Sequence, residues 1–410
     1  MSRGRLLLAL GALGLMLRVG YASHVYFGGI SHPEMDGYET IARELVAHGR
    51  YDFDPGVPTA AREPAYTLLI ALLYAVAGPH PYAIFLAQAV LGLLTCVLIR
   101  STARRIFGET AGDVAFAIAL FYPYFIFYTG YTYRETFLCL AVSAALFLMG
   151  RLVESPRAGR AALAGSAVGL CAVTLSTWMP VCVVICGWAA WNLRRARKVL
   201  AVFLLAVALL PAAWLLRNAV TFGRFIPGST LGGFNLYTAL VVPEEFRGTE
   251  REAEFEAADP HWSRILAMCS LYADDGRQQE AFAAAAAARI RERPGEYLAH
   301  AGRQVVKFWR LYPYPRSYQH SYVWIKLLSL LSDGWLIPLG FWGLWVHRRR
   351  SPEVALLIAV PLSATLVYAL VSAILRYRLP LMIPLIIASS AVIGPFLDRR
   401  PSAKDRGRLS

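Results

Sequence analysis

Apolar residues along this chain are gathered into continuous runs of about 20 positions, which polar segments separate. A helix of that length crosses about 30 Å of hydrocarbon. The runs do not alternate as membrane strands do, so helices must satisfy their backbone groups. We therefore expect an all-α polytopic membrane protein with about ten crossings. The predicted spans are residues 6–27, 82–99, 112–131, 134–151, 161–176, 180–193, 199–219, 324–346, 353–374 and 379–397.

Three of these apolar runs need a separate decision. Residues 6–27 follow two arginines but are longer than a typical signal-peptide core, so we expect a retained first helix. Residues 64–78 are too short for a full crossing, and we predict a juxtamembrane or re-entrant helix in the first outer loop. Residues 161–176 and 180–193 are also short and should form a hairpin that turns at Trp178-Met179-Pro180.

The basic clusters set the predicted orientation. The net charge is +14, and with this count of spans every arginine cluster between apolar runs falls on one side. Because cytoplasmic loops of membrane proteins are rich in Lys and Arg, we expect both termini to be cytoplasmic. The same pattern explains the basic charge without a nucleic-acid partner.

The loops divide the sequence into four predicted regions. Residues 1–220 form an N-terminal transmembrane module, 221–322 an extracytoplasmic loop, 323–398 the last transmembrane helices and 399–410 a cytoplasmic tail. A loop of about 100 residues should carry its own helices. We expect them at Ala281–Arg293 and Glu296–Leu311, capping the outer surface.

Asp36 follows the first span and has two interpretations. Asp36 with Glu39 three positions later is an N-cap pattern for a helix over 37–48, which Gly49 would end. A carboxylate at the outer membrane edge could also act as a base, although the spacing by itself favours the cap, and the two roles are compatible.

Charged residues near the other predicted outer turns are costly so close to hydrocarbon. Arg134 and Glu135 are either a local headgroup anchor or a functional pair. Arg18, inside the first span, either extends toward the outer headgroups or faces inward, where it would pair with a carboxylate or a lipid phosphate.

Four more arginines lie on the predicted outer side, against the positive-inside trend. They are Arg62, Arg217, Arg376 and Arg378. A guanidinium clamps phosphate through parallel hydrogen bonds, so their convergence would favour an anionic ligand at the outer leaflet. Each could instead be an interfacial anchor.

Several other site classes lack sequence support. The histidines and six cysteines show no metal-ligand spacing, and no Walker-A loop, dinucleotide fingerprint or serine nucleophile elbow occurs. A substrate used by this chain must therefore arrive outside the membrane already activated.

In their order, these motifs resemble those of the bacterial membrane glycosyltransferases of the GT-C type, which include protein O-mannosyltransferases, the lipid A aminoarabinose transferase and the RgtA/B/C/D-like enzymes. The resemblance covers about residues 5–400. The matching segments are Asp36-Gly37-Tyr38 to Gly49-Arg50-Tyr51, residues 58–66, Tyr131 to Glu135, Trp214 to Asn218 with residues 223–225, and Arg376 to Pro380.

The resemblance implies an inverting enzyme of the bacterial inner membrane that takes a sugar from a polyprenyl-phosphate sugar. The acceptor would be an extracytoplasmic glycolipid, polysaccharide or protein. By similarity, Asp36 is the general base and Glu135 helps to position the acceptor or a metal. The outer arginines hold the leaving phosphate, and Tyr38, Arg134 and Tyr377 position the substrates.

Two departures from the family pattern are visible. Many relatives have a basic residue before the proline of the third outer turn, where this chain has Trp178-Met179-Pro180. Relatives also commonly have Pro-Gly-Tyr where this chain has Pro64-Ala65-Tyr66. A divalent metal is possible by resemblance, but no ligand is assigned.

Two other functions fit the same membrane topology. A transporter or flippase for a lipid-linked sugar would need internal repeats and broken helices near the midplane. A non-catalytic scaffold for envelope assembly would need neither. The one-sided placement of the charged residues favours the transferase.

Overall fold

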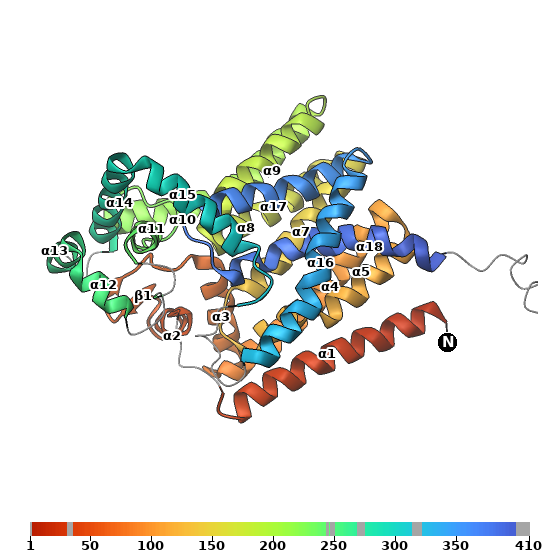
Figure 1. Cartoon of the computed structure of the whole chain (residues 1–410), viewed down its shortest axis with the longest axis horizontal. Helices are drawn as coiled ribbons and strands as arrows, with labels where there is room; N and C mark the ends of the chain where they lie inside the picture. The colour runs from red at the N-terminus through yellow and green to blue at the C-terminus, as the bar shows by residue number, and fades with distance from the viewer. Residues whose placement is uncertain are drawn as a thin grey trace, which may run out of the picture.

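The computed structural model describes residues 2–30, 36–242, 246, 251–268, 275–313 and 322–398. The predicted tail at 399–410 lies outside these residues. Helices dominate, and they form a bundle with a loop-rich end, where α2, α3 and α11–α15 gather (Figure 1). The start of α1 and the end of α18 lie at the opposite end, which we call the terminal end (Figure 1).

The N-terminal half alternates long helices with short connecting elements. Its elements are α1 (Arg3–Phe27), α2 (Tyr38–His48), β1 (Asp52–Asp54), β2 (Val57–Pro58), α3 (Pro64–Ala77), α4 (Pro81–Phe107), α5 (Glu109–Phe121), α6 (Pro123–Phe127), the 3-10 helix η1 (Tyr128–Gly130), α7 (Glu135–Glu154), α8 (Ala158–Thr174), η2 (Ser176–Trp178), α9 (Met179–Asn192) and α10 (Arg197–Phe222).

The C-terminal half contains the helical loop and the last long helices. Its elements are α11 (Gly232–Val241), α12 (Glu252–Ala258), α13 (Pro260–Met268), α14 (Asp275–Glu292), α15 (Pro294–Phe308), α16 (Tyr322–His347), α17 (Pro352–Leu370), η6 (Leu375–Leu381) and α18 (Met382–Asp398). The two predicted loop helices are therefore present as α14 and α15, each beginning before the predicted residue.

The helices agree with the predicted crossings. Among the described residues, seven are long and apolar enough to span a membrane, and the bent pair formed by α5 with α6 and η1 makes eight. The shorter α8 and α9 lie where the hairpin is predicted, with the turn at η2 between them. About ten crossings is thus consistent with the structure. The short antiparallel ribbon of β1 and β2, in the first loop, is a local exception to the all-α prediction.

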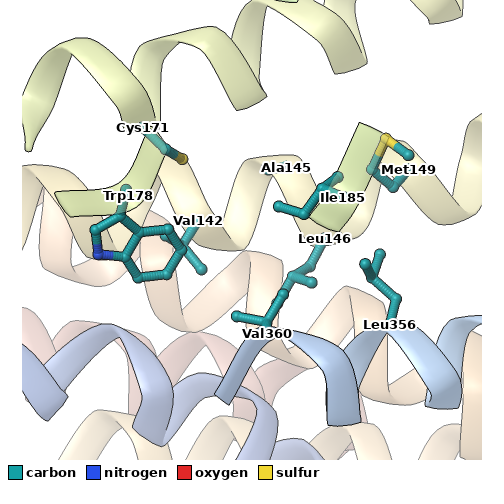
Figure 2. A pocket seen from close by; sticks show the side chains of 9 residues that line it. All are labelled: Val142, Ala145, Leu146, Met149, Cys171, Trp178, Ile185, Leu356 and Val360. Carbon is teal, nitrogen blue, oxygen red and sulfur yellow. The ribbon is translucent and has the colours of Figure 1, made fainter. Parts of the chain in front are cut away.

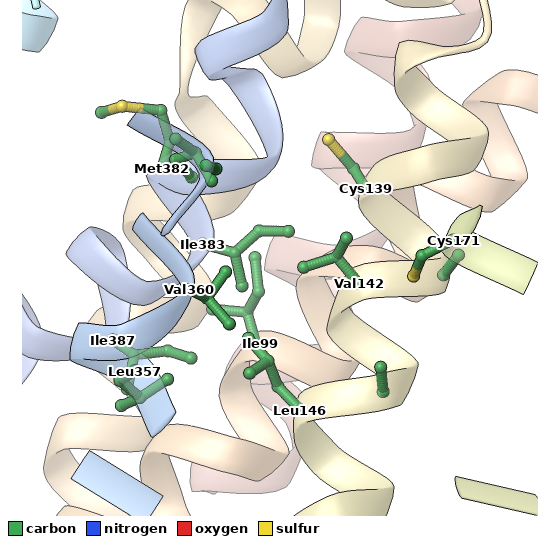
Figure 3. Packing of buried hydrophobic residues seen from close by; sticks show 14 of the residues in the cluster. Ile99, Cys139, Val142, Leu146, Cys171, Leu357, Val360, Met382, Ile383 and Ile387 are labelled. Carbon is green, nitrogen blue, oxygen red and sulfur yellow. The ribbon is translucent and has the colours of Figure 1, made fainter. Parts of the chain in front are cut away.

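The bundle core is apolar and continuous. Side chains of α4, α7, α17 and α18, among them Ile99, Val142, Val360 and Ile383, pack against one another (Figure 3). In the span Leu375–Leu397, formed by η6 and α18, 78% of the most apolar stretch is buried, whereas the corresponding value in α10 is 11%. The last span is therefore central in the bundle, and α10 faces outward. A pocket of about 10 Å³ between α7, α9 and α17 has only apolar walls and is too small for a ligand (Figure 2).

The break between α5 and α6 explains a buried charge. Pro123 has no N–H, so the carbonyl of Ala119 loses its helical donor, and the chain bends by 53°. Arg18 of α1 donates to the Ala119 carbonyl at 3.2 Å and to the Leu120 carbonyl at 3.0 Å. Gly92 of α4 leaves room for this side chain, because a Cβ there would lie 3.0 Å from Nε of Arg18.

Candidate functional site

A cavity of about 290 Å³ lies at the loop-rich end of the bundle. Its walls come from segments far apart in the sequence: the loops around α2 and α3, the turn before α7, η2, the start of α11, the first turn of α14 and the segment around η6. Five charged residues line it: Asp36, Arg62, Glu63, Arg134 and Arg376. The site is therefore assembled by tertiary contacts between both halves of the chain.

Asp36 faces two guanidinium groups in this wall. Nη1 of Arg376 lies 3.2 Å from Oδ2 of Asp36, and Nη2 of Arg62 lies 3.7 Å from Oδ1. Nε of Arg62 also donates a short hydrogen bond to the Asp36 carbonyl. The Asp36 side chain is 17% exposed, so it remains open to the cavity.

The predicted capping role of Asp36 is wrong. Helix α2 begins at Tyr38, its N-cap is Gly37, and no side chain caps it. Gly37 has a φ of 74°, and a Cβ there would lie 2.1 Å from the Phe53 ring. This left-handed glycine turns the chain into α2 and leaves the Asp36 carboxylate facing the arginines. Gly49 ends the helix as predicted.

Arg376 connects Asp36 with Glu135. Its Nε lies 3.4 Å from Oε1 of Glu135, and its guanidinium lies over the Tyr133 ring, 4.5 Å from the centroid. Glu135 is 1% exposed, and neither of its carboxylate oxygens has a hydrogen-bond partner within the described chain. The two predicted catalytic acids thus share one guanidinium group.

A second, buried network supports this wall. Nη1 of Arg134 donates to Oε2 of Glu63 at 2.6 Å and to the Tyr38 hydroxyl at 2.7 Å. The other Glu63 oxygen accepts a hydrogen bond from the backbone N–H of Ser176 in η2, at 2.7 Å. Glu63 therefore joins the first loop to two other turns, a role that our sequence prediction missed. Its position between Arg62 and Pro64 was the available signal.

The surrounding charges shift the pKa of Asp36. Burial alone would raise it, but the nearby guanidinium groups of Arg376, Arg62 and Arg134 outweigh burial and lower the pKa below its ordinary value. Burial is also the main cause of the raised pKa of Tyr38. At neutral pH the site therefore presents an ionised Asp36 beside a neutral Tyr38 phenol.

Tyr377 also reaches the cavity, and its ring stacks on Tyr368 with centroids 5.2 Å apart. The structure thus brings together seven predicted site residues. They are Asp36, Glu135, Arg62, Arg376, Arg134, Tyr38 and Tyr377.

Three predicted phosphate-binding arginines lie elsewhere. Arg217 donates to the carbonyls of Thr59 and Tyr51, at 2.8 and 3.2 Å, and so ties α10 to the first loop. Arg378 is 2% exposed and pairs with buried Asp333 of α16.

Arg18, the third, is fully buried at the α5 bend and pairs with backbone carbonyls. Of the two outcomes that the sequence suggested, it faces inward and does not extend to the headgroups, but its partners are backbone carbonyls and not a carboxylate. None of these three lines the cavity.

Within the described chain, no three His, Cys, Asp or Glu side chains converge as metal ligands would. Arg376 lies between the carboxylates of Asp36 and Glu135.

Comparison with known families confirms the GT-C resemblance. Residues 58–216 match the family described as dolichyl-phosphate-mannose-protein mannosyltransferase. The matched segment contains Arg62, Glu63, Arg134 and Glu135, and ends before α11. No curated protein matches the chain.

Solved structures show the same fold. The oligosaccharyltransferase of Archaeoglobus fulgidus in its apo form aligns with a TM-score of 0.55 and 13% identity, over 98% of this chain and 52% of that one. This chain therefore spans about half the length of the archaeal enzyme. ArnT from Cupriavidus metallidurans, solved with undecaprenyl phosphate, aligns with a TM-score of 0.46 and 17% identity, over 96% of this chain and 79% of that one.

Proposed function

We propose that this chain is an inverting glycosyltransferase that moves a sugar from a polyprenyl-phosphate sugar to an acceptor outside the membrane. The observation that carries the proposal is the Asp36 carboxylate, held between Arg376 and Arg62 in the wall of a cavity. An acid and two phosphate-binding groups are what this transfer needs. The description of the matched family names a sugar linked to a lipid phosphate, which supports a lipid-phosphate sugar as the donor.

In this proposal the donor phosphate competes with Asp36 for the guanidinium groups. Arg376 and Arg62 lower the pKa of Asp36 while the cavity is empty, which makes Asp36 a weak base. A bound phosphate would draw the same groups toward its oxygens, since Arg clamps phosphate well. The pKa of Asp36 then rises, so donor binding prepares the base.

The reaction is a single displacement. An acceptor hydroxyl attacks the anomeric carbon, and Asp36 takes the hydroxyl proton as the new C–O bond forms. The bond between that carbon and the phosphate oxygen breaks, and its electron pair leaves with the polyprenyl phosphate. Arg376 and Arg62 stabilise this charge, which is the large electrostatic contribution in such sites. Attack opposite the leaving group inverts the anomeric carbon.

The remaining site residues position these groups. Glu135 holds the other side of the Arg376 guanidinium, and Tyr133 lies beneath it. Arg134, fixed by Glu63, orients the Tyr38 hydroxyl. We place this end of the bundle on the outer face of a bacterial inner membrane, with both termini cytoplasmic, because the arginine clusters lie at the other ends of the spans.

The test is Asp36→Asn in membranes supplied with polyprenyl phosphate carrying a radiolabelled sugar. Removing a general base should lower transfer about 100- to 10,000-fold. Donor binding should persist, because both arginines remain. The matched control is Asp113→Asn. Asp113 is also an acid paired with arginines, but it lies near the start of α5, at the terminal end of the bundle. Unchanged transfer by the Asp36 variant would remove Asp36 as the base.

A further inference from the structure

The segments that line the cavity differ in chemistry. The five charged residues come from the other segments, whereas the helical loop contributes no charged lining residue. We call its contribution the neutral face, which includes Ser229, Phe234, Asn235 and Gln278. Ligand sites are commonly lined by aromatic side chains with a few placed amide and hydroxyl groups.

Gln278 is the most distinctive residue of this neutral face. It is 4% exposed, it lines the cavity, and its amide makes no hydrogen bond within the described part of the chain. The amide is accessible from the cavity, so it can form hydrogen bonds with a molecule bound there. A ligand that supplies both a donor and an acceptor would satisfy this amide, and sugar hydroxyls do so.

The surrounding structure holds Gln278 in place. Three residues earlier, at the start of α14, the Asp275 carboxylate accepts hydrogen bonds from the Thr59 hydroxyl at 2.6 Å and the Ala60 N–H at 2.9 Å. The next residue, Gln279, accepts a hydrogen bond from the N–H of Gly233 in α11 at 2.6 Å. Both contacts fix the first turn of α14 against the cavity.

Phe234 is fixed in the same way. Its ring packs against Trp262 and Phe282, with centroids 5.3 and 5.4 Å apart. The neutral face is therefore preorganised, and its ring and amide do not depend on a bound ligand for their positions.

The charges of the lining residues limit which kinds of sugar the cavity can bind. Each of the three lining guanidinium groups pairs with a carboxylate, and Arg376 also contacts Glu135. In the proposed reaction the donor phosphate draws Arg62 and Arg376 toward itself, and Asp36 acts as the base. Glu63 stays paired with Arg134, so no lining carboxylate is assigned to hold a sugar ammonium group.

We infer that Gln278 selects an uncharged monosaccharide as the sugar that is transferred, through hydrogen bonds between its amide and the sugar hydroxyls. This inference rests on the proposed function. A cavity of about 290 Å³ lies at the small end of ligand sites, which suits one ring better than an oligosaccharide.

Donor binding tests this without knowledge of the acceptor. The purified full chain in lipid nanodiscs is titrated with polyprenyl phosphate alone and with the same lipid carrying a neutral hexose, an amino sugar or a uronic acid. Wild type should bind the neutral-sugar lipid most tightly. Gln278→Leu should lose about tenfold in affinity for that lipid, because the sugar hydroxyls then lose their hydrogen-bond partner. It should lose none for the sugarless lipid.

Charge variants sharpen the result. Gln278→Glu should shift the preference toward the amino sugar, whereas Ala284→Glu, which adds the same charge to an exposed position of α14, should not. Equal weakening of all four lipids by Gln278→Leu, no weakening of any, or a wild-type preference for a charged sugar would overturn the inference. If wild type binds none of the lipids, the proposed function itself fails.

Discussion

Two clusters of acids and arginines lie at opposite ends of α1, a helix about 37 Å long at 1.5 Å per residue. At the terminal end, Arg3 and Arg100 pair with Glu109 and Asp113. At the loop-rich end, Arg376, Arg62 and Arg134 pair with Asp36, Glu135 and Glu63. The residue types are the same, so their difference lies in their surroundings.

The terminal cluster contains the most exposed ion pair of the two clusters, and the cavity cluster contains the most buried one. The side chains of Arg3 and Glu109 are 48% and 53% exposed, whereas those of Glu63 and Arg134 are 1% and 10% exposed. Exposed ion pairs contribute about 0–1 kcal/mol. Buried ones must offset a large desolvation cost, and apolar residues often replace them without loss of stability. Three of the six charged residues around the cavity, Glu63, Arg134 and Glu135, are buried. Their burial is therefore better explained by ligand chemistry than by stability.

The largest expected effect of breaking a pair is at the cavity. Arg134→Met leaves Glu63 buried without its charge partner and should lower the free energy of unfolding by roughly 3–5 kcal/mol. Denaturant titration in detergent micelles measures this. Adding Glu63→Gln to the same chain should restore part of the loss. A loss below about 1 kcal/mol would mean that the pair behaves like a surface pair.

Arg376→Met should act on activity and on its pH dependence. Loss of a charged hydrogen bond to the phosphate should reduce kcat/KM for the donor about 10- to 100-fold. Arg376 helps to lower the pKa of Asp36, and without it burial should raise that pKa. Because the base must be ionised, the variant should lose activity on acidification at a higher pH than wild type does. The pH profile of kcat/KM measures this shift.

Arg376→Lys is the matched control for the pH shift. It keeps the positive charge beside Asp36 but loses the planar guanidinium. The acid limb of its pH profile, which is the fall of kcat/KM at low pH, should therefore stay near that of wild type. An acid limb that stays in place, or moves to lower pH, in the Met variant would contradict the proposed pairing of Arg376 with the base.

The smallest effect is expected at the terminal end. Arg100→Gln removes a partner of Asp113 and Glu109, yet should cost less than about 1 kcal/mol, since these pairs are partly exposed. Added salt should reduce the remaining difference from wild type. Donor kcat/KM should not change. The same denaturant titration and transfer assay serve here, and a loss above about 2 kcal/mol would erase the contrast between the clusters.

The sequence predicts the membrane helices well because a span is a local property. Length and continuous apolarity decide it, whatever the helix later packs against. Each predicted crossing has a helix at its position, including the short pair at α8 and α9. The ends are less accurate, since α2 begins after Gly37 and not after a capping Asp36.

The site was only partly predictable, because the partner of each arginine depends on how the helices pack. Sequence placed many arginines on one side of the membrane but could not say which of them have other partners. Arg378 meets Asp333, Arg217 meets backbone carbonyls of the first loop, and Arg18 meets carbonyls freed by a proline break. A buried charge takes the best partner that helix packing brings within reach, and no local pattern specifies that partner.

The amino-acid sequence by itself determined the membrane-spanning helices, the crowding of acids and arginines near one set of their ends, and the resemblance to lipid-phosphate-dependent transferases. Only the tertiary structure decided that Arg376 meets Asp36, 340 residues earlier in the chain, and also Glu135, and that Gln278 faces the same cavity. Hydrophobicity acts along the chain and can be summed over neighbouring residues. Charge pairing and cavity walls act through space, so they exist only once the helices have packed.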